Sequence, residues 1–576
     1  MSISSRRPLV FALGLLALSG CAHDWIARSN ENTNLLIAAE APFDAEQAGH
    51  EGIPGFDEAI SDNLPGHPAR HRAALVQASA QLEERARSEA DPQVLQDLAI
   101  LQESAARRIR RIDLTQRLTV PFENVGRAVF FGVQSLLDPQ VAASRRPAAL
   151  VRLRKYTGLE PGTRPLTELV EAEIREALKE PGLLRPSRSE VQTAVERLPI
   201  FADSIEKLFA KYPMAHAEEA LAALRRQLNS HLLFLQRELL PQALVDFRLP
   251  SELYAFRLET VGVDIPAAEL TAMAHQGFDA IQKEMQPLAA AVAQARHLPS
   301  ADYRDVIRAL KKEQIPDDQV LAHYQGRLAD LEAIIRERAL VTLPKRPARI
   351  RIGTPGENAQ QPAPHMVPAR TVGNTGEQGE FVLPLSVPGA QEAKYDDFNY
   401  AAVSWTLTAH EARPGHELQF DRMVETGTSL ARMLFAFNSV NVEGWGLYAE
   451  SMVLPFMPDE GKLVSLQFRL MRAARAFLDP ELQAGKITPE AANAFLQREV
   501  VLSPANARQE VDRYTFDSPG QATAYYYGYV RMKELRADVE KAQGAQFNAR
   551  AFHDAVLAQG LLPPRLLRKA LLGPAP

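Results

Sequence analysis

The chain has 576 residues, of which 46% are hydrophobic and 24% charged, a composition typical of a folded protein with a sizeable core. Its formal net charge of −6 argues against a nucleic-acid-binding protein, because there is no basic excess to neutralise phosphates. The same balance provides no polybasic surface for anionic lipids.

The first twenty residues have the order of an export signal. Arg6 and Arg7 precede an apolar run over residues 9–18, which is too short to span a membrane. The tetrapeptide LSGC at 18–21 resembles the bacterial lipobox, and Cys21 is the single cysteine of the chain. We predict a lipoprotein signal peptide over 1–20 and lipidation of Cys21; a plain secretory signal that contains a cysteine is the alternative.

The predicted lipid would be the protein's sole contact with a membrane. The residue after Cys21 is Ala22 rather than Asp. By resemblance to lipoprotein sorting, this favours the outer membrane. We therefore expect a protein anchored in the cell envelope that faces the periplasm.

Proline and glycine recur over residues 21–65, which we interpret as a tether and an irregular lead-in segment. Residues 66–343 have the apolar spacing and the Leu-, Ala-, Arg- and Glu-rich composition of helices, so we expect a helical lobe there. The expected helical stretches cover residues 71–111, 166–178, 218–240, 267–295 and 320–341.

The pattern changes over residues 344–390, where we predict a small sheet. Arg349–Ile352 alternates with a period of two, and Glu380–Val387 is an apolar run of strand formers. Pro384 restricts the second run to an edge strand or a bulge, and a Gly/Pro-rich loop over 353–379 separates the runs. Helical texture returns over 391–576, so we predict one mostly α domain over 66–576 with a small β insert.

The segment from His410 to His416, HEARPGH, carries the first chemical signal. Zinc helices usually offer two histidines four positions apart, because about 400° of rotation places both rings on one face. The six-residue separation found here turns about 600° and points the rings about 120° apart on a regular helix. A regular helix therefore cannot bring the two rings to one metal ion.

The residues between the histidines can interrupt the helix. Pro414 lacks an N–H and disfavours helical geometry at Arg413, and Gly415 can adopt a positive φ. This interruption can return His416 to the metal that His410 binds. The alternative is a helix that simply stops at Pro-Gly, with two unrelated histidines at its end.

A second segment, NSVNVEGWGLYAE, offers a candidate third ligand. Asn441 can cap a helix that runs to about Val453, with Glu443 in its first turn and Glu450 on the same face. Gly444 and Gly446 in this helix indicate close approach of another backbone, since glycine costs helix stability.

Two histidines and one glutamate leave a fourth zinc position for water, as in hydrolytic sites. Glu411 can then act as the general base, and Glu450 can accept a hydrogen bond from a ligand histidine. A solvated acidic helix start is the alternative for Glu443, and a surface carboxylate for Glu450. Arg513 can hold a substrate carboxylate, and tyrosine hydroxyls such as that of Tyr514 can donate to an oxyanion or simply pack in the core.

The motifs HEARPGHELQ, VEGWGLYAE, VDRY and PGQATAY together resemble the bacterial family called domain of unknown function 885, over roughly residues 50–570. Its members are exported, often lipoproteins, and related to the gluzincin metallopeptidases. The resemblance implies His410, His416 and Glu443 as zinc ligands and Glu411 as the catalytic carboxylate. Among the neighbouring tyrosines, the resemblance implies that Tyr525 is the catalytic one.

The resemblance further implies a large, helical, cleft-bearing fold like that of carboxypeptidase Taq or thimet oligopeptidase. Glu380–Val387 would be the edge strand that receives an extended peptide by β-addition. Two positions depart from the family pattern. Glu417 and Gln483 stand where relatives often carry histidine, and the second departure puts activity in question.

The sequence thus predicts a zinc-dependent metallopeptidase-like hydrolase with a peptide substrate and no nucleic-acid partner. Zinc hydrolysis of a non-peptide amide or ester is a first alternative. A catalytically silent lipoprotein that binds a cell-envelope partner is a second.

Overall fold

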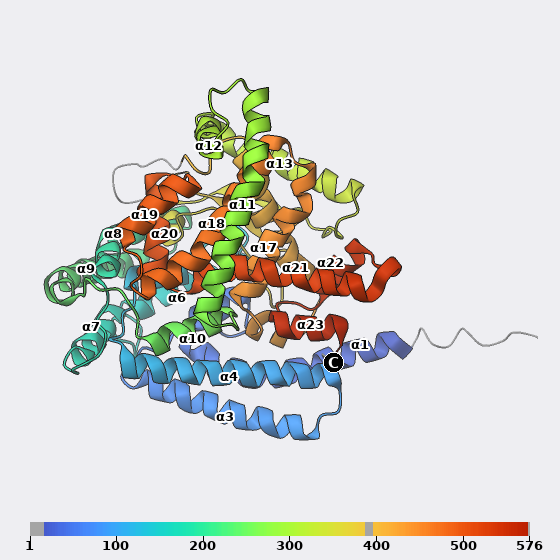
Figure 1. The fold of residues 1–576 in the computed structure, drawn as a ribbon. Coiled ribbons are helices and arrows are strands. Elements are labelled where there is room, and N and C mark those ends of the chain that lie inside the picture. The colour runs from blue at the N-terminus through green and yellow to red at the C-terminus, as the bar shows by residue number, and fades with distance from the viewer. Residues whose placement is uncertain (1–16, 386–395, 574–576) are drawn as a thin grey trace, which may run out of the picture.

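The computed structural model describes residues 17–385 and 396–573, and within these ranges it confirms the predicted mostly α fold with a small β insert (Figure 1). The helices are α1 (Ala17–Glu40), α2 (Ala45–Glu51), α3 (His67–Ser88), α4 (Pro92–Leu118), α5 (Val125–Gln134), α6 (Pro147–Tyr156), α7 (Leu166–Ala177), α8 (Arg188–Lys211), α9 (Ala217–Phe234), α10 (Ser251–Val261), α11 (Ala267–Ala295), α12 (Tyr303–Lys311), α13 (Asp317–Glu337), α14 (Pro355–Gln360), α15 (Val403–Leu407), α16 (His416–Thr426), α17 (Ser439–Val453), α18 (Asp459–Gln483), α19 (Pro489–Phe495), α20 (Pro504–Asp512), α21 (Ala524–Gln543), α22 (Ala549–Ala558) and α23 (Pro564–Leu572). The strands are β1 (Arg349–Ile352), β2 (His365–Val367) and β3 (Glu380–Leu383).

Several predicted helices have their expected bounds, and one is divided. α11 covers residues 267–295 as predicted, and α7 ends one residue before the predicted boundary. The expected helix over 71–111 is two helices, α3 and α4. Asp91 caps α4 by accepting from the Gln93 N–H, and Pro92 occupies the first helical position, where its missing N–H costs nothing.

The segment expected to be an irregular tether is largely helical, so that prediction is wrong. α1 and α2 occupy much of residues 21–65. Ser29 Oγ donates to Asp97 at 2.6 Å, and Asn30 Oδ1 accepts from the Leu430 N–H at 2.8 Å. These tertiary contacts override the weak helix propensity of a Ser- and Asn-rich run. The predicted signal peptide lies mostly in residues 1–16, outside the described ranges, and lipidation of Cys21 stays a prediction.

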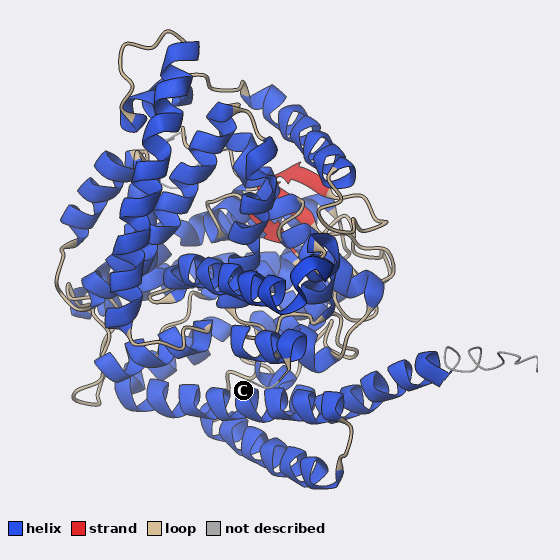
Figure 2. Cartoon of the chain, turned by 45° about the vertical axis from the view of Figure 1, so that its right-hand side comes forward, coloured by secondary structure: helices blue, strands red, loops and turns tan. Residues whose placement is uncertain are grey.

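The small sheet, red in Figure 2, lies among the helices. Its strand order is β1-β3-β2, with β1 parallel and β2 antiparallel to β3. β2 comes from the segment that we expected to be a loop. β3 is therefore the central strand, and the prediction that Glu380–Val387 is a peptide-receiving edge strand is wrong. The paired residues end at Leu383, so Pro384 follows the strand and interrupts no ladder; positions 386 and 387 lie outside the described residues.

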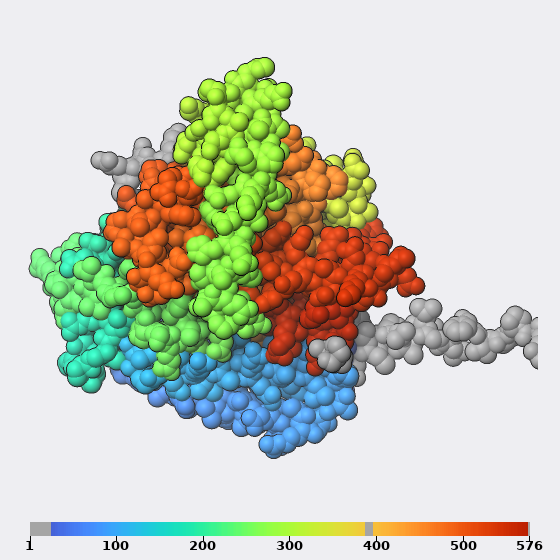
Figure 3. Space-filling model, in the orientation of Figure 1, coloured from blue at the N-terminus to red at the C-terminus, as the bar shows by residue number. Residues whose placement is uncertain are grey.

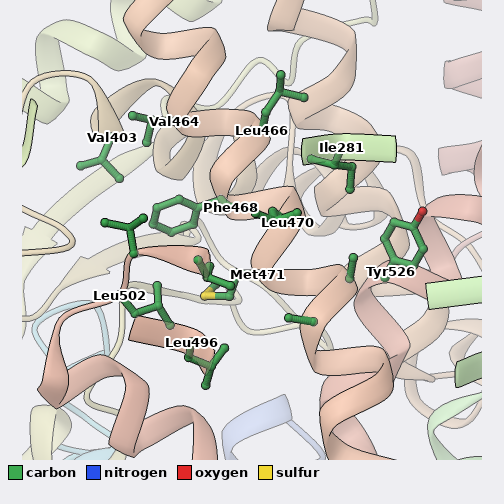
Figure 4. Packing of buried hydrophobic residues seen from close by; sticks show 14 of the residues in the cluster. Ile281, Val403, Val464, Leu466, Phe468, Leu470, Met471, Leu496, Leu502 and Tyr526 are labelled. Carbon is green, nitrogen blue, oxygen red and sulfur yellow. The ribbon is translucent and has the colours of Figure 1, made fainter. Parts of the chain in front are cut away.

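The core is built by long helices from distant parts of the chain. α11 packs along α18, and α17 packs against α21, while α3 and α4 lie side by side and both contact α1 (Figure 1). In the space-filling view, α11 crosses this face of the molecule between the segments that contain α19–α20 and α21–α22 (Figure 3). Phe468 and Met471 of α18 lie amid the largest apolar cluster, close to Leu502 and Leu496 (Figure 4). The division into domains stays a prediction.

Candidate metal centre

The interruption between the two histidines takes a specific form. α15 continues into a π-helical turn, η4 (Thr408–Ala412), which carries His410 and Glu411. The chain then leaves the helix at Arg413, whose backbone is extended with φ −125° and ψ 129°, and passes through a cis peptide bond to Pro414. α16 begins at His416. The helix therefore stops and restarts between the histidines, as the Pro-Gly sequence predicted.

Gly415 is needed here for a reason other than the one expected from the sequence. Its φ is −80°, so it does not use the left-handed region. A Cβ on this residue would lie 1.8 Å from the carbonyl oxygen of His410, so only glycine permits the close approach. Trp445 Nε1 donates to the carbonyl oxygens of Pro414 and Gly415 at 3.1 and 3.2 Å, which holds the loop against α17.

α17 presents the third candidate ligand. Its cap is Asn438, which accepts from the Asn441 N–H at 2.8 Å, so the prediction that Asn441 is the cap is wrong. Asn441 instead accepts from Gln419 and donates to the Leu562 carbonyl. The helix consequently starts earlier than expected, and Glu443 lies in its second turn.

Two glycines allow α17 to approach its neighbours, as their presence in a helix predicted. A Cβ on Gly444 would lie 2.6–2.8 Å from backbone atoms of Gly528 in α21. A Cβ on Gly446 would lie 2.6–2.9 Å from three atoms of the His410 ring. The first glycine therefore lets two helices touch, and the second makes room for a candidate ligand.

His410, His416 and Glu443 converge, with candidate ligand atoms that all lie within 4.8 Å of one another. Glu443 Oε2 is 3.4 Å from His410 Nε2 and 3.3 Å from His416 Nε2. Tetrahedral zinc with N and O ligands at about 2.0–2.1 Å separates neighbouring ligand atoms by about 3.3–3.4 Å. Glu443 Oε2 is buried and has no hydrogen-bond partner among the described residues, as expected of an atom reserved for a cation. The donor set and these two separations are therefore compatible with a bound metal ion.

Glu450 lies behind the first histidine. Its Oε1 is 2.7 Å from His410 Nδ1, and its Oε2 accepts from the Thr406 hydroxyl at 2.6 Å. Burial lowers the pKa of His410, but the adjacent carboxylates of Glu443 and Glu450 outweigh burial and raise that pKa to about 9. Burial opposes ionisation of Glu443 too, yet the two histidines hold its pKa well below the usual range. The carboxylates are therefore ionised and aimed at the imidazoles.

The candidate ligands line a cavity of about 700 Å³, which is within the usual size range of small-molecule sites. Glu411 and Tyr525 also line it, and the Tyr525 ring stacks on the His410 ring with centroids 6.3 Å apart. Burial and the neighbouring Glu443 raise the pKa of Tyr525, so its hydroxyl stays protonated. The structure thus brings the predicted base and the predicted tyrosine to the same space as the candidate ligands.

Sequence reasoning missed His365, which lines the cavity from β2. Its Nδ1 is 2.8 Å from the Ala363 carbonyl oxygen, so Nδ1 carries the proton and donates. Burial lowers the pKa of His365, although the hydrogen bond to the Ala363 carbonyl and the nearby Glu411 oppose this effect. A lone histidine between prolines, 45 positions before the first ligand, gave no spacing signal in the sequence.

Arginine side chains also line the cavity, and three of them lie near Tyr525. Arg513, which the sequence suggested, begins the π-helical turn η8 (Arg513–Asp517), whereas Arg472 and Arg475 of α18 were not predicted. Tyr514 does not line the cavity; its hydroxyl donates to Glu510 at 2.7 Å.

The two departures from the family pattern lie away from the cavity lining. Glu417 accepts a bidentate pair of hydrogen bonds from Arg413 at 2.6 and 2.9 Å. Gln483 accepts from the Leu249 N–H and donates to the Tyr514 carbonyl. Neither residue lines the cavity, so neither departure removes a side chain from it.

Comparison with known proteins gives a family and a fold. The model of a family described as bacterial protein of unknown function (DUF885) matches residues 42–571. Two solved structures, both described as candidate lipoproteins, share the fold. The protein from Shewanella oneidensis, of unknown function, is 19% identical with a TM-score of 0.71, and that from Colwellia psychrerythraea is 17% identical with a TM-score of 0.75. Each comparison covers 94% of this chain and 98% of the other.

No curated protein matches the sequence. Within the described ranges, no helix combines the length and the apolar character that crossing a bilayer requires.

Proposed function

The chain belongs to the DUF885 family of bacterial proteins of unknown function, and we propose that it is a zinc-dependent hydrolase that cleaves peptides. The observation that carries this proposal is the spacing around Glu443 Oε2, which lies 3.4 and 3.3 Å from the Nε2 atoms of His410 and His416. A site with two histidines and one glutamate leaves a zinc position open, as hydrolytic rather than structural sites do. The adjoining cavity gives that position access to a substrate.

The residues around the ligands fit hydrolysis of an amide bond. When bound, zinc supplies Lewis-acid chemistry that polarises a carbonyl and activates water near neutral pH. Glu411, next to the first ligand, takes the proton from the attacking water and delivers it to the leaving amine. The hydroxyl of Tyr525 donates a hydrogen bond to the developing oxyanion. His365 offers Nε2 on the β2 side of the cavity as a further hydrogen-bonding group.

The free edge of the sheet supports a peptide rather than a smaller substrate. β2 pairs with β3 on one side, and on its other side no strand of the described residues pairs with it. His365 and Met366 of β2 line the cavity, so an extended peptide can add to this edge. The proposal includes that the fold and the metal centre are related to those of the gluzincin metallopeptidases.

The proposed location is the cell envelope, with the N-terminal lipid on Cys21 in the outer membrane and the cavity in the periplasm. The lipobox-like residues 18–21 support this location. The two structural neighbours are themselves described as candidate lipoproteins.

Substitution of Glu411 tests the hydrolase directly. The Glu411→Gln variant should retain zinc and lose at least about 10²-fold in turnover of a broad peptide library, because general base catalysis typically contributes that much. Glu425→Gln, on α16 but outside the cavity lining, is the control and should keep full turnover. Equal turnover in wild type and Glu411→Gln would overturn the mechanism. Zinc-bound wild type that cleaves no member of the library would favour the silent binding protein.

A further inference from the structure

Three arginines on one wall of the cavity carry more positive charge than the carboxylates paired with them neutralise. The guanidinium carbons of Arg475, Arg513 and Arg472 lie 4.5, 5.8 and 6.0 Å from the ring centroid of Tyr525. All three arginines line the cavity. Because this ring stacks on that of His410, the arginines are close neighbours of the candidate metal centre.

Only one of these arginines has a dedicated counter-ion. Arg475 donates from Nε and Nη2 to the two carboxylate oxygens of Glu510, both at 2.6 Å. Tyr514 donates to the same carboxylate, so Glu510 accepts three hydrogen bonds from groups already in the fold. This pair fixes the position of Arg475 in the cavity wall.

Arg472 is buried without a partner that matches its charge. Its side chain is 5% exposed, and Nη1 donates to the Phe468 carbonyl at 3.2 Å. Nε is buried and has no hydrogen-bond partner among the described residues. The nearest carboxylate, that of Glu450, is 3.9 Å from Nη2 and already receives hydrogen bonds from His410 and Thr406.

Arg513 is the second arginine of this wall without a hydrogen-bonded carboxylate. Its Nη1 is 4.0 Å from Glu510, beyond hydrogen-bond distance, and no described residue accepts a hydrogen bond from its guanidinium. The side chain is 22% exposed and lines the cavity. Both guanidinium groups line the same cavity, and neither has a carboxylate within hydrogen-bond distance, which is unfavourable for a buried cation.

We propose that Arg472 and Arg513 form a subsite for a carboxylate of the peptide substrate, beside Tyr525 and the metal centre. Guanidinium groups bind carboxylates with paired, charge-assisted hydrogen bonds, which are stronger than neutral ones. The other carboxylates near this wall, Glu411 and Glu443, belong to the proposed catalytic machinery. The proposal rests on the proposed function for the nature of the substrate.

The position of this subsite limits the kind of peptide it accepts. One extended residue spans about 3.3–3.6 Å. Only the Tyr525 ring separates the subsite from the metal centre, so a carboxylate bound there lies within about one or two residues of the bond to be cleaved. The carboxylate is then either the C-terminal one of a peptide that ends near the cleaved bond, or that of an Asp or Glu side chain near it.

The test measures equilibrium binding to the zinc-loaded Glu411→Gln chain by titration calorimetry. The probes are acetyl-tetraalanine with a free C-terminal carboxylate and the same peptide as its C-terminal amide. A second pair of amidated peptides contains Asp or Asn at the third position. We expect one carboxylate-bearing probe to bind at least about tenfold more tightly than its neutral partner, as a charge-assisted hydrogen bond provides.

The preference should disappear in Arg472→Gln and in the more exposed Arg513→Gln, so a folding defect in one variant does not decide the result. Arg107→Gln, which changes another cavity arginine near Glu103, should keep it. If the free acid of the first pair binds more tightly than the amide, the subsite binds a C-terminal carboxylate. If the Asp peptide of the second pair binds more tightly than the Asn peptide, it binds a side-chain carboxylate. Equal binding within both pairs would overturn the subsite.

Failure of the subsite and failure of the hydrolase give different results. A carboxylate preference that depends on the arginines, in a protein that cleaves no peptide, would leave the subsite standing without the hydrolase. Peptide cleavage without any carboxylate preference would leave the hydrolase and remove the subsite.

Discussion

Glu450 accepts a hydrogen bond from Nδ1 of His410 at 2.7 Å, and this contact orients the ring so that Nε2 faces Glu443. A carboxylate behind a metal-binding histidine selects the ring tautomer and increases the basicity of the ligand nitrogen. Thr406 holds the other oxygen of Glu450. The candidate metal centre is therefore supported from behind by a second carboxylate.

Removal of this support should weaken zinc binding without abolishing it. We expect Glu450→Gln to lower zinc affinity by about 10–100-fold, the usual effect of changing such a partner. Competition with a chromophoric chelator measures the affinity. Glu534→Gln, on the exposed side of α21, is the control and should bind zinc like the wild type. Unchanged affinity in Glu450→Gln would show that the hydrogen bond has no influence on the metal.

Gly446 should be essential for the position of His410. In Gly446→Ala, the new Cβ would lie 2.6 Å from a ring carbon of His410, and the ring must move. We expect zinc binding to fall sharply while the circular dichroism of the folded protein is retained. Gly326→Ala in α13 is the matched control, because its Cβ meets no atom within 4 Å. That variant should keep zinc and gain about 0.5–1 kcal/mol of stability. Normal zinc binding in Gly446→Ala would contradict the packing described here.

His365 should contribute to turnover but not to metal binding. It lines the cavity from β2 and is not among the three residues whose ligand atoms converge. We expect His365→Gln to keep zinc and to lose about 10²-fold in kcat, the scale of one lost transition-state hydrogen bond. Steady-state kinetics and elemental analysis of the same preparation check both parts. Loss of zinc from His365→Gln would identify it as a ligand.

His553 should make the fold sensitive to mild acid. It is buried between Tyr448 and the Leu340 carbonyl, and burial lowers its pKa from 6.5 to about 4. Between these values the unfolded chain binds a proton that the folded chain does not, so stability is lost as pH falls below 6.5.

The size of this effect follows from the same two pKa values. We expect the free energy of unfolding contributed by His553 to decrease by about 2 kcal/mol from pH 7 to pH 5. Urea denaturation of wild type and His553→Gln at both pH values measures it, and the difference between the two proteins should shrink by that amount. A constant difference would show that His553 titrates normally in the folded state.

The convergence of the three candidate ligands was predictable because its signals are local. The Pro-Gly break lies between His410 and His416, and the helical spacing of Glu443 and Glu450 places both carboxylates near His410. The bounds of α11 and β1 likewise follow from apolar periodicity within one segment.

The missed features depend on contacts between distant segments. The strand order places β3 in the centre because β2 folds back on it, which no local pattern in residues 353–379 indicates. α1 is stabilised by residues such as Asp97 and Leu430, far along the chain. Arg472 looks like an ordinary helix residue in the sequence, and its place in the cavity wall depends on how α18 packs.

The zinc content of the purified full chain is the most direct test of the central proposal that His410, His416 and Glu443 bind one metal ion. Elemental analysis after reconstitution with zinc and dialysis should give about one zinc per chain for wild type and almost none for His416→Ala or Glu443→Gln. Glu417→Gln, beside His416 but directed at Arg413, should retain the metal. A folded wild type without zinc, or equal zinc in wild type and both ligand variants, would contradict the proposed metal site.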